Sequence, residues 1–195
     1  VARDLEDAMA IGPNQVYVIP PDAILTIRGG SLHLTRPAPP AARRISINTF
    51  LTSLAEDQGE NAIGIILSGF GSDGALGVAA IKEHGGLTLS QAEFDHHAKS
   101  GMPQSAAAGG FVDHVLSVED MPGALLDYRH HRIICDANKG PDGIRQDLPS
   151  HLATICAVLH GRLGRDFSQY KTGTLVRRIQ RRMHVLQSRE VPAYI

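Results

Sequence analysis

The sequence is poor in the residues that mark several special classes of protein. It has no Trp and only two Cys, Cys135 and Cys156, which form neither a C-x-x-C motif nor a metal-binding spacing with His. The cysteines therefore give no support to a disulfide, a zinc site or redox chemistry, and we expect two buried free thiols. No apolar run approaches the roughly 18 residues of a membrane helix, and the N-terminus lacks a signal-peptide core. We expect a cytoplasmic protein.

The chain also lacks an excess of positive or negative charge. Nineteen Lys and Arg stand against 20 Asp and Glu in 195 residues, so no whole-chain field draws the protein to nucleic acid or lipid. Apolar residues make up 43% of the chain, with 20 Gly and 11 Pro, a globular composition that excludes collagen, a coiled coil or a disordered chain. Val1 stands in place of an initiator Met, so we expect a piece of a longer chain.

The first third of the chain predicts a small antiparallel element. Residues Val16–Ile19 read as a strand that ends in turn residues. Residues Ile24–Arg28 and Ser31–Thr35 alternate around Gly29-Gly30, which is a two-residue hairpin signal. The proline-rich stretch Arg36–Arg44 predicts an extended connection.

Strands and helices then alternate, which favours a parallel sheet with helices on both faces. We therefore predict an α/β fold, a doubly wound parallel sheet with an antiparallel hairpin. From about residue 130 the pattern changes, and the turn-rich residues 138–146 suggest a domain boundary before a small all-α segment. The alternating elements are a helix with Ile47, Phe50, Leu51 and Leu54, a strand Ile63–Leu67, a helix Ala75–His84, a strand Leu87–Leu89, a helix after Pro103, a strand Val112–Leu116 and a helix from Glu119 to about Arg129. The all-α segment has apolar stripes at Leu152, Ile155, Cys156 and Leu159 and at Leu175, Ile179, Met183 and Leu186.

The strongest local feature is the glycine-rich stretch Ser68–Gly74, between a buried strand and a helix. Such turns lie at the carboxyl edge of a parallel sheet, where α/β proteins place anion sites and catalytic groups. Asp73 is predicted either to cap the following helix or to act in catalysis. The glycines also match the G-x-G-x-x-G motif, and Glu93 lies about where an acidic residue would bind the ribose of a dinucleotide. A dinucleotide site is therefore a rival interpretation. Against it, that fingerprint usually opens the first βα unit of a fold.

Other chemistry has weaker support. No G-x-S-x-G motif occurs, so a hydrolase nucleophile elbow is absent from this chain. Adjacent residues such as His96-His97 and His130-His131 point apart, so we predict no metal site, and His33 is expected on a solvent face. A cluster of cations without acids favours a solvated helix face or a site for an anionic partner, but offers no aromatic platform for single strands. It comprises Lys171, Arg177, Arg178, Arg181 and Arg182.

Three separated motifs resemble the catalytic domain of chemotaxis receptor methylesterases of the CheB type. They are residues 15–21 (QVYVIPP), 65–74 (IILSGFGSDG) and 101–103 (GMP), and the likeness covers about residues 10–128. Residues 164–171 (GRDFSQYK) and 175–183 (LVRRIQRRM) resemble the N-terminal helical subdomain of CheR-type methyltransferases. Both in one chain indicate a CheB/CheR hybrid.

The first resemblance implies hydrolysis of γ-glutamyl methyl esters on chemoreceptors by a Ser-His-Asp triad, without a cofactor. Asp73 matches the triad acid, and the backbone N–H of Phe70 matches an oxyanion donor, although the family usually has Met there. Gly71 belongs to the same loop, and Met102 matches a residue that shapes the cleft. The resemblance places the serine and histidine upstream of this chain, so we expect the chain to be inactive by itself.

The second resemblance implies a receptor-binding role for the basic helix. It also implies S-adenosylmethionine as the cofactor of the parent methyltransferase, bound beyond the residues present here. The domains would be a methylesterase part at 1–129, a linker at 130–147 and a methyltransferase part at 148–195, both parts incomplete. Methylated chemoreceptors are the expected partners, with no nucleic acid and no membrane insertion. A non-catalytic receptor-binding module remains an alternative, and regulation by a receiver or sensor domain stays open. The helix would contact receptors through Arg177, Arg178, Arg181 and Arg182.

Overall fold

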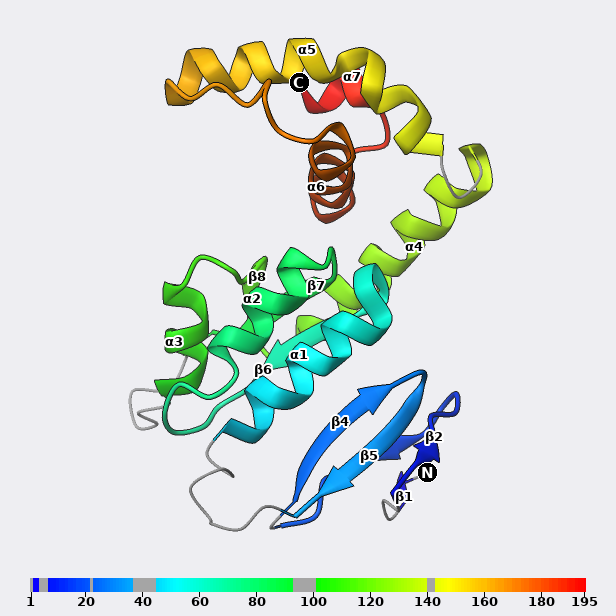
Figure 1. The fold of residues 1–195 in the computed structure, drawn as a ribbon, viewed down its shortest axis with the longest axis vertical. Coiled ribbons are helices and arrows are strands. Elements are labelled where there is room, and N and C mark those ends of the chain that lie inside the picture. The colour runs from blue at the N-terminus through cyan, green and yellow to red at the C-terminus, as the bar shows by residue number, and fades with distance from the viewer. Residues whose placement is uncertain (1, 4–6, 22, 37–44, 93–100, 140–142) are drawn as a thin grey trace. The chain divides into compact units, whose positions relative to one another are not determined.

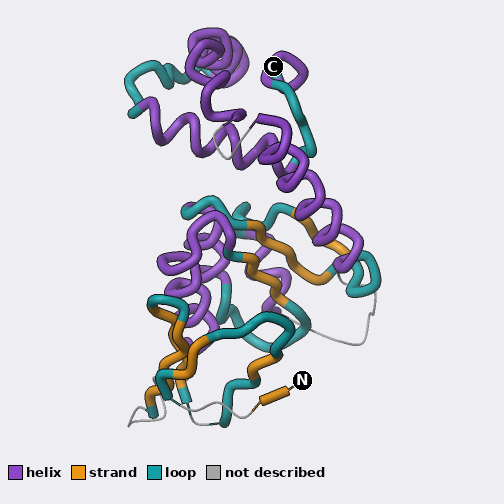
Figure 2. Tube along the Cα trace, turned by 90° about the vertical axis from the view of Figure 1, so that its right-hand side faces the viewer, coloured by secondary structure: helices purple, strands orange, loops and turns teal. Residues whose placement is uncertain are grey.

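The computed structural model describes residues 2–3, 7–21, 23–36, 45–92, 101–139 and 143–195 (Figure 1). Most of the proline-rich connection, Glu93, His96-His97 and the side chain of Cys135 lie outside the described residues. The chain forms two compact units, Val1–Glu119 and Asp120–Ile195. Figure 2 shows that the strands belong to the first unit and that the second is helical.

The first unit begins with the predicted hairpin. Strands β4 (Ile24–Arg28) and β5 (Ser31–Thr35) pair in antiparallel fashion, and Arg28 lies opposite Ser31. Gly29 and Gly30 have φ of 58° and 70°, as a tight two-residue turn of the primed kind requires. Strand β2 (Met9–Ala10) adds a short third strand. The predicted strand from Val16 is shorter than expected. Strand β3 (Val16–Tyr17) has two residues and, within the described part of the chain, pairs in parallel with β1 (Ala2–Arg3).

The alternating region forms a parallel sheet of three strands in the order β6 (Ile63–Ile66), β7 (Leu87–Gln91) and β8 (His114–Leu116). Helix α2 (Ala75–Glu83) connects β6 to β7, and α3 (Gly101–Ala108) precedes β8. The α/β class and the separate antiparallel hairpin are confirmed. The sheet places the end of β6 beside the end of β7, where the glycine-rich loop begins.

Helix α1 (Ser46–Gln58) connects the hairpin to the sheet through two apolar contacts. Its buried Leu51 and Ala55 pack with Ile66, Val78 and Ile81 in the main core of the unit. Its partly buried Phe50 and Leu54 also pack against the hairpin core of Leu25, Ile27 and Leu32. The predicted apolar stripe is confirmed, and the two-sided burial fixes α1 between the two sheets.

The second unit consists of four helices in its described residues. They pack around a core in which Leu148 and Met183 are fully buried. The predicted linker at 130–147 is helical where it is described. The predicted stripe on the third helix is wrong at Leu186, which follows the helix end and is 53% exposed. Cys156 is free and half-buried, against the expected burial. The helices are α4 (Met121–Lys139), α5 (Gly143–Leu163), α6 (Thr172–Val185) and α7 (Val191–Tyr194).

A buried pair of histidines lies in this unit. The rings of His131 on α4 and His184 on α6 meet edge to face, with centroids 5.6 Å apart. Both side chains are buried. Burial lowers the pKa of His131 below its usual value of 6.5, and the positive charges of Arg189 and His130 lower it further.

This depressed pKa predicts a pH dependence of stability. Below about pH 6.5 the unfolded chain binds a proton at residue 131 more readily than the folded chain does, so the free energy of unfolding falls as the medium acidifies. Urea titrations at pH 7.5 and 5.5 measure this difference. We expect it to shrink in His131→Gln and to remain in His160→Gln, a change at an exposed position of α5. Equal pH dependence in all three proteins would contradict the prediction.

Candidate functional site

The glycine-rich loop, residues 68–74, follows β6 at the carboxyl edge of the parallel sheet. The N–H of Ser68 donates to Oε1 of Gln91 at the end of β7, at 2.8 Å. The N–H of Met102, at the start of α3, donates to the carbonyl oxygen of Gly69 at 3.1 Å. The Met102 thioether packs over Gly69, because a Cβ at residue 69 would lie 2.5 Å from Sδ of Met102. The loop is therefore fixed by β7 and α3.

Asp73 caps a helix, but a different one from the helix expected. Its two carboxylate oxygens accept the backbone N–H groups of Ile47 and Asn48, each at 2.9 Å, in the first turn of α1. The residue before α1, Ile45, makes no side-chain capping bond, so Asp73 supplies from a distance the cap that α1 lacks locally. The prediction that Asp73 caps the helix after it is wrong, because Gly74 takes that position in a left-handed conformation.

Asn48 makes the reciprocal cap on α2, and sequence reasoning did not identify it. Its Oδ1 accepts the N–H groups of Gly74 and Gly77, both at 2.9 Å. The only sequence signal was indirect: α1 and α2 both begin without a capping side chain at the preceding residue. The cap also counts against the dinucleotide interpretation, because the α2 amides that a pyrophosphate would use already donate to Asn48.

Phe70 and Gly71 form the exposed tip of the loop. The Phe70 side chain is 89% exposed, and Gly71 has φ of 93°, a conformation that favours glycine. Within the part of the chain that the structure describes, the Phe70 N–H has no acceptor. A backbone donor with no partner can bind a developing negative charge on a substrate oxygen.

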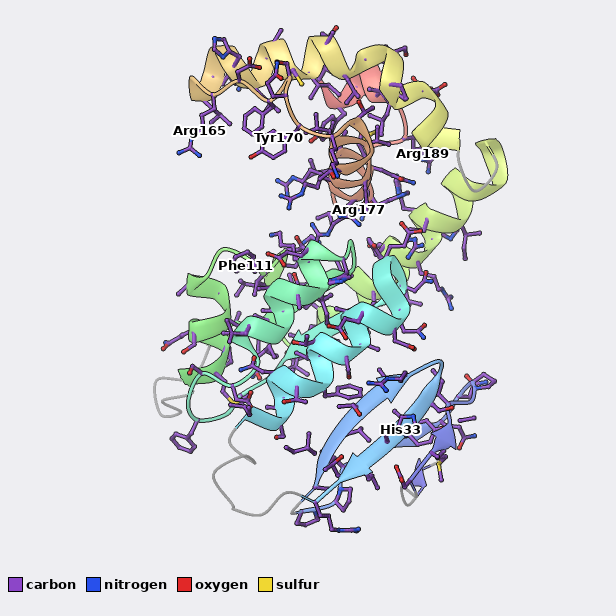
Figure 3. All side chains as sticks on the ribbon, in the orientation of Figure 1. His33, Phe111, Arg165, Tyr170, Arg177 and Arg189 are labelled. Atoms are coloured by element: carbon purple, nitrogen blue, oxygen red, sulfur yellow. The ribbon has the colours of Figure 1, made fainter. Side chains whose placement is uncertain are left out.

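The structure thus brings Phe70, Gly71, Asp73 and Met102 together around one loop. A carboxylate has about four acceptor positions, and Asp73 uses two of them on α1, so it can also accept from a histidine ring. His33 is separate from this group. It lies on the hairpin, 41% exposed, with Nδ1 at 3.8 Å from a carboxylate oxygen of Asp7 (Figure 3).

The predicted basic face lies on α6, in the second unit. Arg177, Arg178 and Arg182 are exposed and Arg181 is half-buried. Figure 3 labels Arg177 on this helix. The opposite face contributes Val176, Ile179 and Met183 to the core. The separation into a packed face and a cationic face is as predicted.

The described ranges contain neither a candidate metal cluster nor a membrane-spanning helix. No three His, Cys, Asp or Glu side chains there stand close enough to hold a metal ion. None of the helices described is both long and apolar enough to cross a membrane.

Comparison with known proteins gives matches for both units. The family CheB methylesterase matches residues 2–125, and the family CheR methyltransferase, all-alpha domain, matches residues 150–195. A 104.1 kDa protein of Rhodobacter capsulatus is 35% identical over 98% of this chain and 22% of its own length. A protein-glutamate methylesterase/protein-glutamine glutaminase of Methylobacillus flagellatus is 39% identical over 60% of this chain and 34% of its own length.

A solved structure agrees with these matches. The CheB methylesterase catalytic domain of Thermotoga maritima aligns with a TM-score of 0.55 and 27% identity, over 63% of this chain and 67% of that one. The chain spans about a fifth to a third of the two relatives named above. Because the family match covers most of the first unit and includes the loop with Asp73, the chain belongs to the CheB methylesterase family.

Proposed function

We propose that this chain is part of a protein-glutamate methylesterase, in which Asp73 is the acid of a Ser-His-Asp triad. The observation that carries the proposal is the fixed Asp73 carboxylate at the carboxyl edge of the parallel sheet, with acceptor capacity left over. Family membership supports the substrate class, γ-glutamyl methyl esters on chemoreceptors. The family resemblance implies that the parent protein supplies the serine and histidine from outside the residues described here.

In this reaction the serine oxygen attacks the ester carbonyl while the histidine takes its proton. Collapse of the tetrahedral intermediate breaks the bond to the methoxy group, which leaves as methanol with the proton from histidine. Water then hydrolyses the acyl-enzyme and frees the glutamate carboxylate. Asp73 accepts the histidine Nδ1–H, which sets the tautomer and stabilises the imidazolium.

The other loop residues have supporting roles. The Phe70 N–H donates to the oxyanion of the intermediate. Gly71 allows the backbone turn that presents this N–H, and Met102 supports the loop by packing on Gly69. The Phe70 side chain points to solvent, so a main-chain donor tolerates Phe where the family usually has Met.

We also propose that the parent is a CheB/CheR hybrid. Residues 1–129 would form the methylesterase part, 130–147 the connection and 148–195 the helical subdomain of the methyltransferase, whose S-adenosylmethionine binds elsewhere in the parent. The match to residues 150–195 supports this division. The cationic face of α6, with Arg177, Arg178, Arg181 and Arg182, would contact acidic receptor segments and raise the association rate.

The esterase proposal is tested with the full-length parent and a methyl-esterified receptor fragment. We expect methanol release, and absence of methanol from a parent that contains both serine and histidine would overturn the proposal. Binding of the fragment without hydrolysis would favour the receptor-binding module.

NAD is expected to leave the melting temperature of the protein unchanged, because the α2 amides that a dinucleotide would use are capped by Asn48.

The receptor-binding role of α6 predicts a charge effect. Arg177→Glu with Arg178→Glu should lower the association rate for a receptor fragment about tenfold at low salt, and less at high salt. The matched control is Arg162→Glu with Arg165→Glu, which makes the same charge change at exposed positions outside α6. Surface plasmon resonance at two salt concentrations measures both. Equal losses in the two double variants would contradict the specific role of α6.

A further inference from the structure

Asn48 connects the candidate acid to the start of α2 through three hydrogen bonds. Its backbone N–H donates to Oδ1 of Asp73, and its side-chain oxygen accepts from Gly74 and Gly77. Asp73, which accepts the bond from the Asn48 backbone, and Gly74, which donates to the Asn48 side chain, are adjacent in sequence. Both residues of the Asp73–Gly74 pair are therefore hydrogen-bonded to Asn48, one through its backbone and the other through its side chain.

The same contact joins two helix N-termini. The Asp73 carboxylate accepts from the second and third backbone N–H groups of α1. The Asn48 side chain accepts from the N–H groups of the N-cap residue Gly74 and of the third residue of α2, Gly77. Helix N-termini have partial positive charge, so each helix is capped by an oxygen from the element beside it. The close approach of α1 and α2 at Gly77 keeps the two ends in register.

The position of Asp73 is thus set by α1, although its own loop belongs to β6 and α2. We propose that Asn48 is a positioning residue for the esterase reaction, because it holds the Asp73 carboxylate at the angle from which a histidine ring can donate to it. This inference rests on the proposed function. It assigns to Asn48 a role that acts through Asp73 and involves no contact with substrate.

The consequences differ between three substitutions in the parent. Asn48→Leu keeps the approximate volume but removes the side-chain acceptor, so the Asp73–Gly74 turn loses its anchor. Asn48→Asp keeps an oxygen that can accept from Gly74 and Gly77. Ser53→Ala is the matched control, because the Ser53 hydroxyl on α1 accepts the N–H of Ile27 at 3.0 Å, donates to the carbonyl oxygen of Phe50, and has no hydrogen bond to the glycine-rich loop among the described residues.

We expect Asn48→Leu to lower kcat about 100-fold, as a misplacement of about 1 Å does, with little change in KM. Asn48→Asp should recover most of this loss, and Ser53→Ala should retain wild-type kcat. The acidic limb of the kcat/KM profile should move to lower pH in Asn48→Leu, because a misplaced carboxylate stabilises the imidazolium less. Unchanged kcat in Asn48→Leu, or an equal loss in Ser53→Ala, would overturn the inference.

Amide hydrogen exchange of the same proteins gives a readout that needs no activity. Asn48→Leu should speed exchange at Gly74 and Gly77, and also at Ile47, because the Ile47 N–H donates to the Asp73 carboxylate that the substitution displaces. If the wild-type parent is inactive, the proposed function fails, and exchange at Ile47 then reports separately whether the Asn48 side chain holds the Asp73 carboxylate in place. Wild-type exchange at Ile47 would then overturn the inference.

Discussion

Asp73→Asn in the full-length parent should lower kcat for methyl-ester hydrolysis by about 10⁴, the loss that the same change causes in a serine protease triad. An asparagine presents an amide nitrogen where the histidine Nδ1–H needs an acceptor, so the histidine is held in the wrong tautomer. Methanol release per enzyme, measured at saturating substrate, reports this change.

The same substitution also weakens the cap on α1. Two backbone donors, Ile47 and Asn48, share the two oxygens of Asp73, and an asparagine offers only one. We expect a loss of about 1 kcal/mol in the free energy of unfolding, within the usual range for a helix cap. The kinetic loss must therefore be separated from a loss of folded protein.

Asp57→Asn is the matched control for that separation. The Asp57 carboxylate also accepts two backbone N–H groups, those of Gly29 and Gly30 at the hairpin turn. Hydrogen bonds from the Gln58 side chain and from these two amides lower the pKa of Asp57, so its ionised form is the one that holds the turn. Asp57→Asn should destabilise the fold and leave kcat unchanged. An equal kinetic loss in both variants, or more than a tenth of wild-type kcat in Asp73→Asn, would refute the triad role.

Gly77→Ala should destabilise the chain, although alanine is the better helix former. A Cβ at residue 77 would lie 2.5 Å from Cβ and 2.9 Å from Cδ1 of Leu51. The Leu51 Cβ is fixed to the α1 backbone and cannot rotate away, so α1 and α2 must separate. Overpacking of this kind costs about 1–3 kcal/mol, more than the roughly 1 kcal/mol that helix propensity returns.

Gly161→Ala on α5 is the matched change without the clash, because a Cβ there has no heavy atom within 4 Å. It should stabilise the helix by up to about 1 kcal/mol. Urea titration followed by circular dichroism measures both variants. Stabilisation by Gly77→Ala would mean that α1 and α2 do not hold the observed close contact. Since that contact aligns Asp73 with α1, Gly77→Ala should also lower the activity of the parent.

Much of the fold follows from local pattern. The Gly29-Gly30 turn, the stripe on α1, the alternation of β6, α2 and β7, and the two-faced α6 are each specified by residues close together in sequence. Hydrophobic periodicity and turn chemistry act over a few residues, so the sequence alone predicts such elements. The Asp73 loop follows in the same way from glycines between an apolar strand and a helix, although β6 is buried on one face only and not on both as expected.

The length of α4 was not predicted, nor was the parallel pairing of β3 with β1. Strands of two residues are too short to show an alternation of apolar and polar residues, and their pairing depends on how the rest of the chain places them.

Local pattern identified the loop residues Phe70, Gly71 and Asp73 as candidates, whereas the role of Asn48 and the hydrogen-bond partners of Asp73 follow from the packing of α1 against α2. Asp73 stands next to the start of α2 in sequence, and every local rule assigns it to that helix. In the folded chain the Asp73 oxygens accept hydrogen bonds from backbone N–H groups 26 and 25 residues away on α1. The side-chain oxygen of Asn48, on α1, in turn accepts a hydrogen bond at the start of α2. Capping needs an oxygen within hydrogen-bond distance of an amide, and folding, not sequence separation, sets that distance.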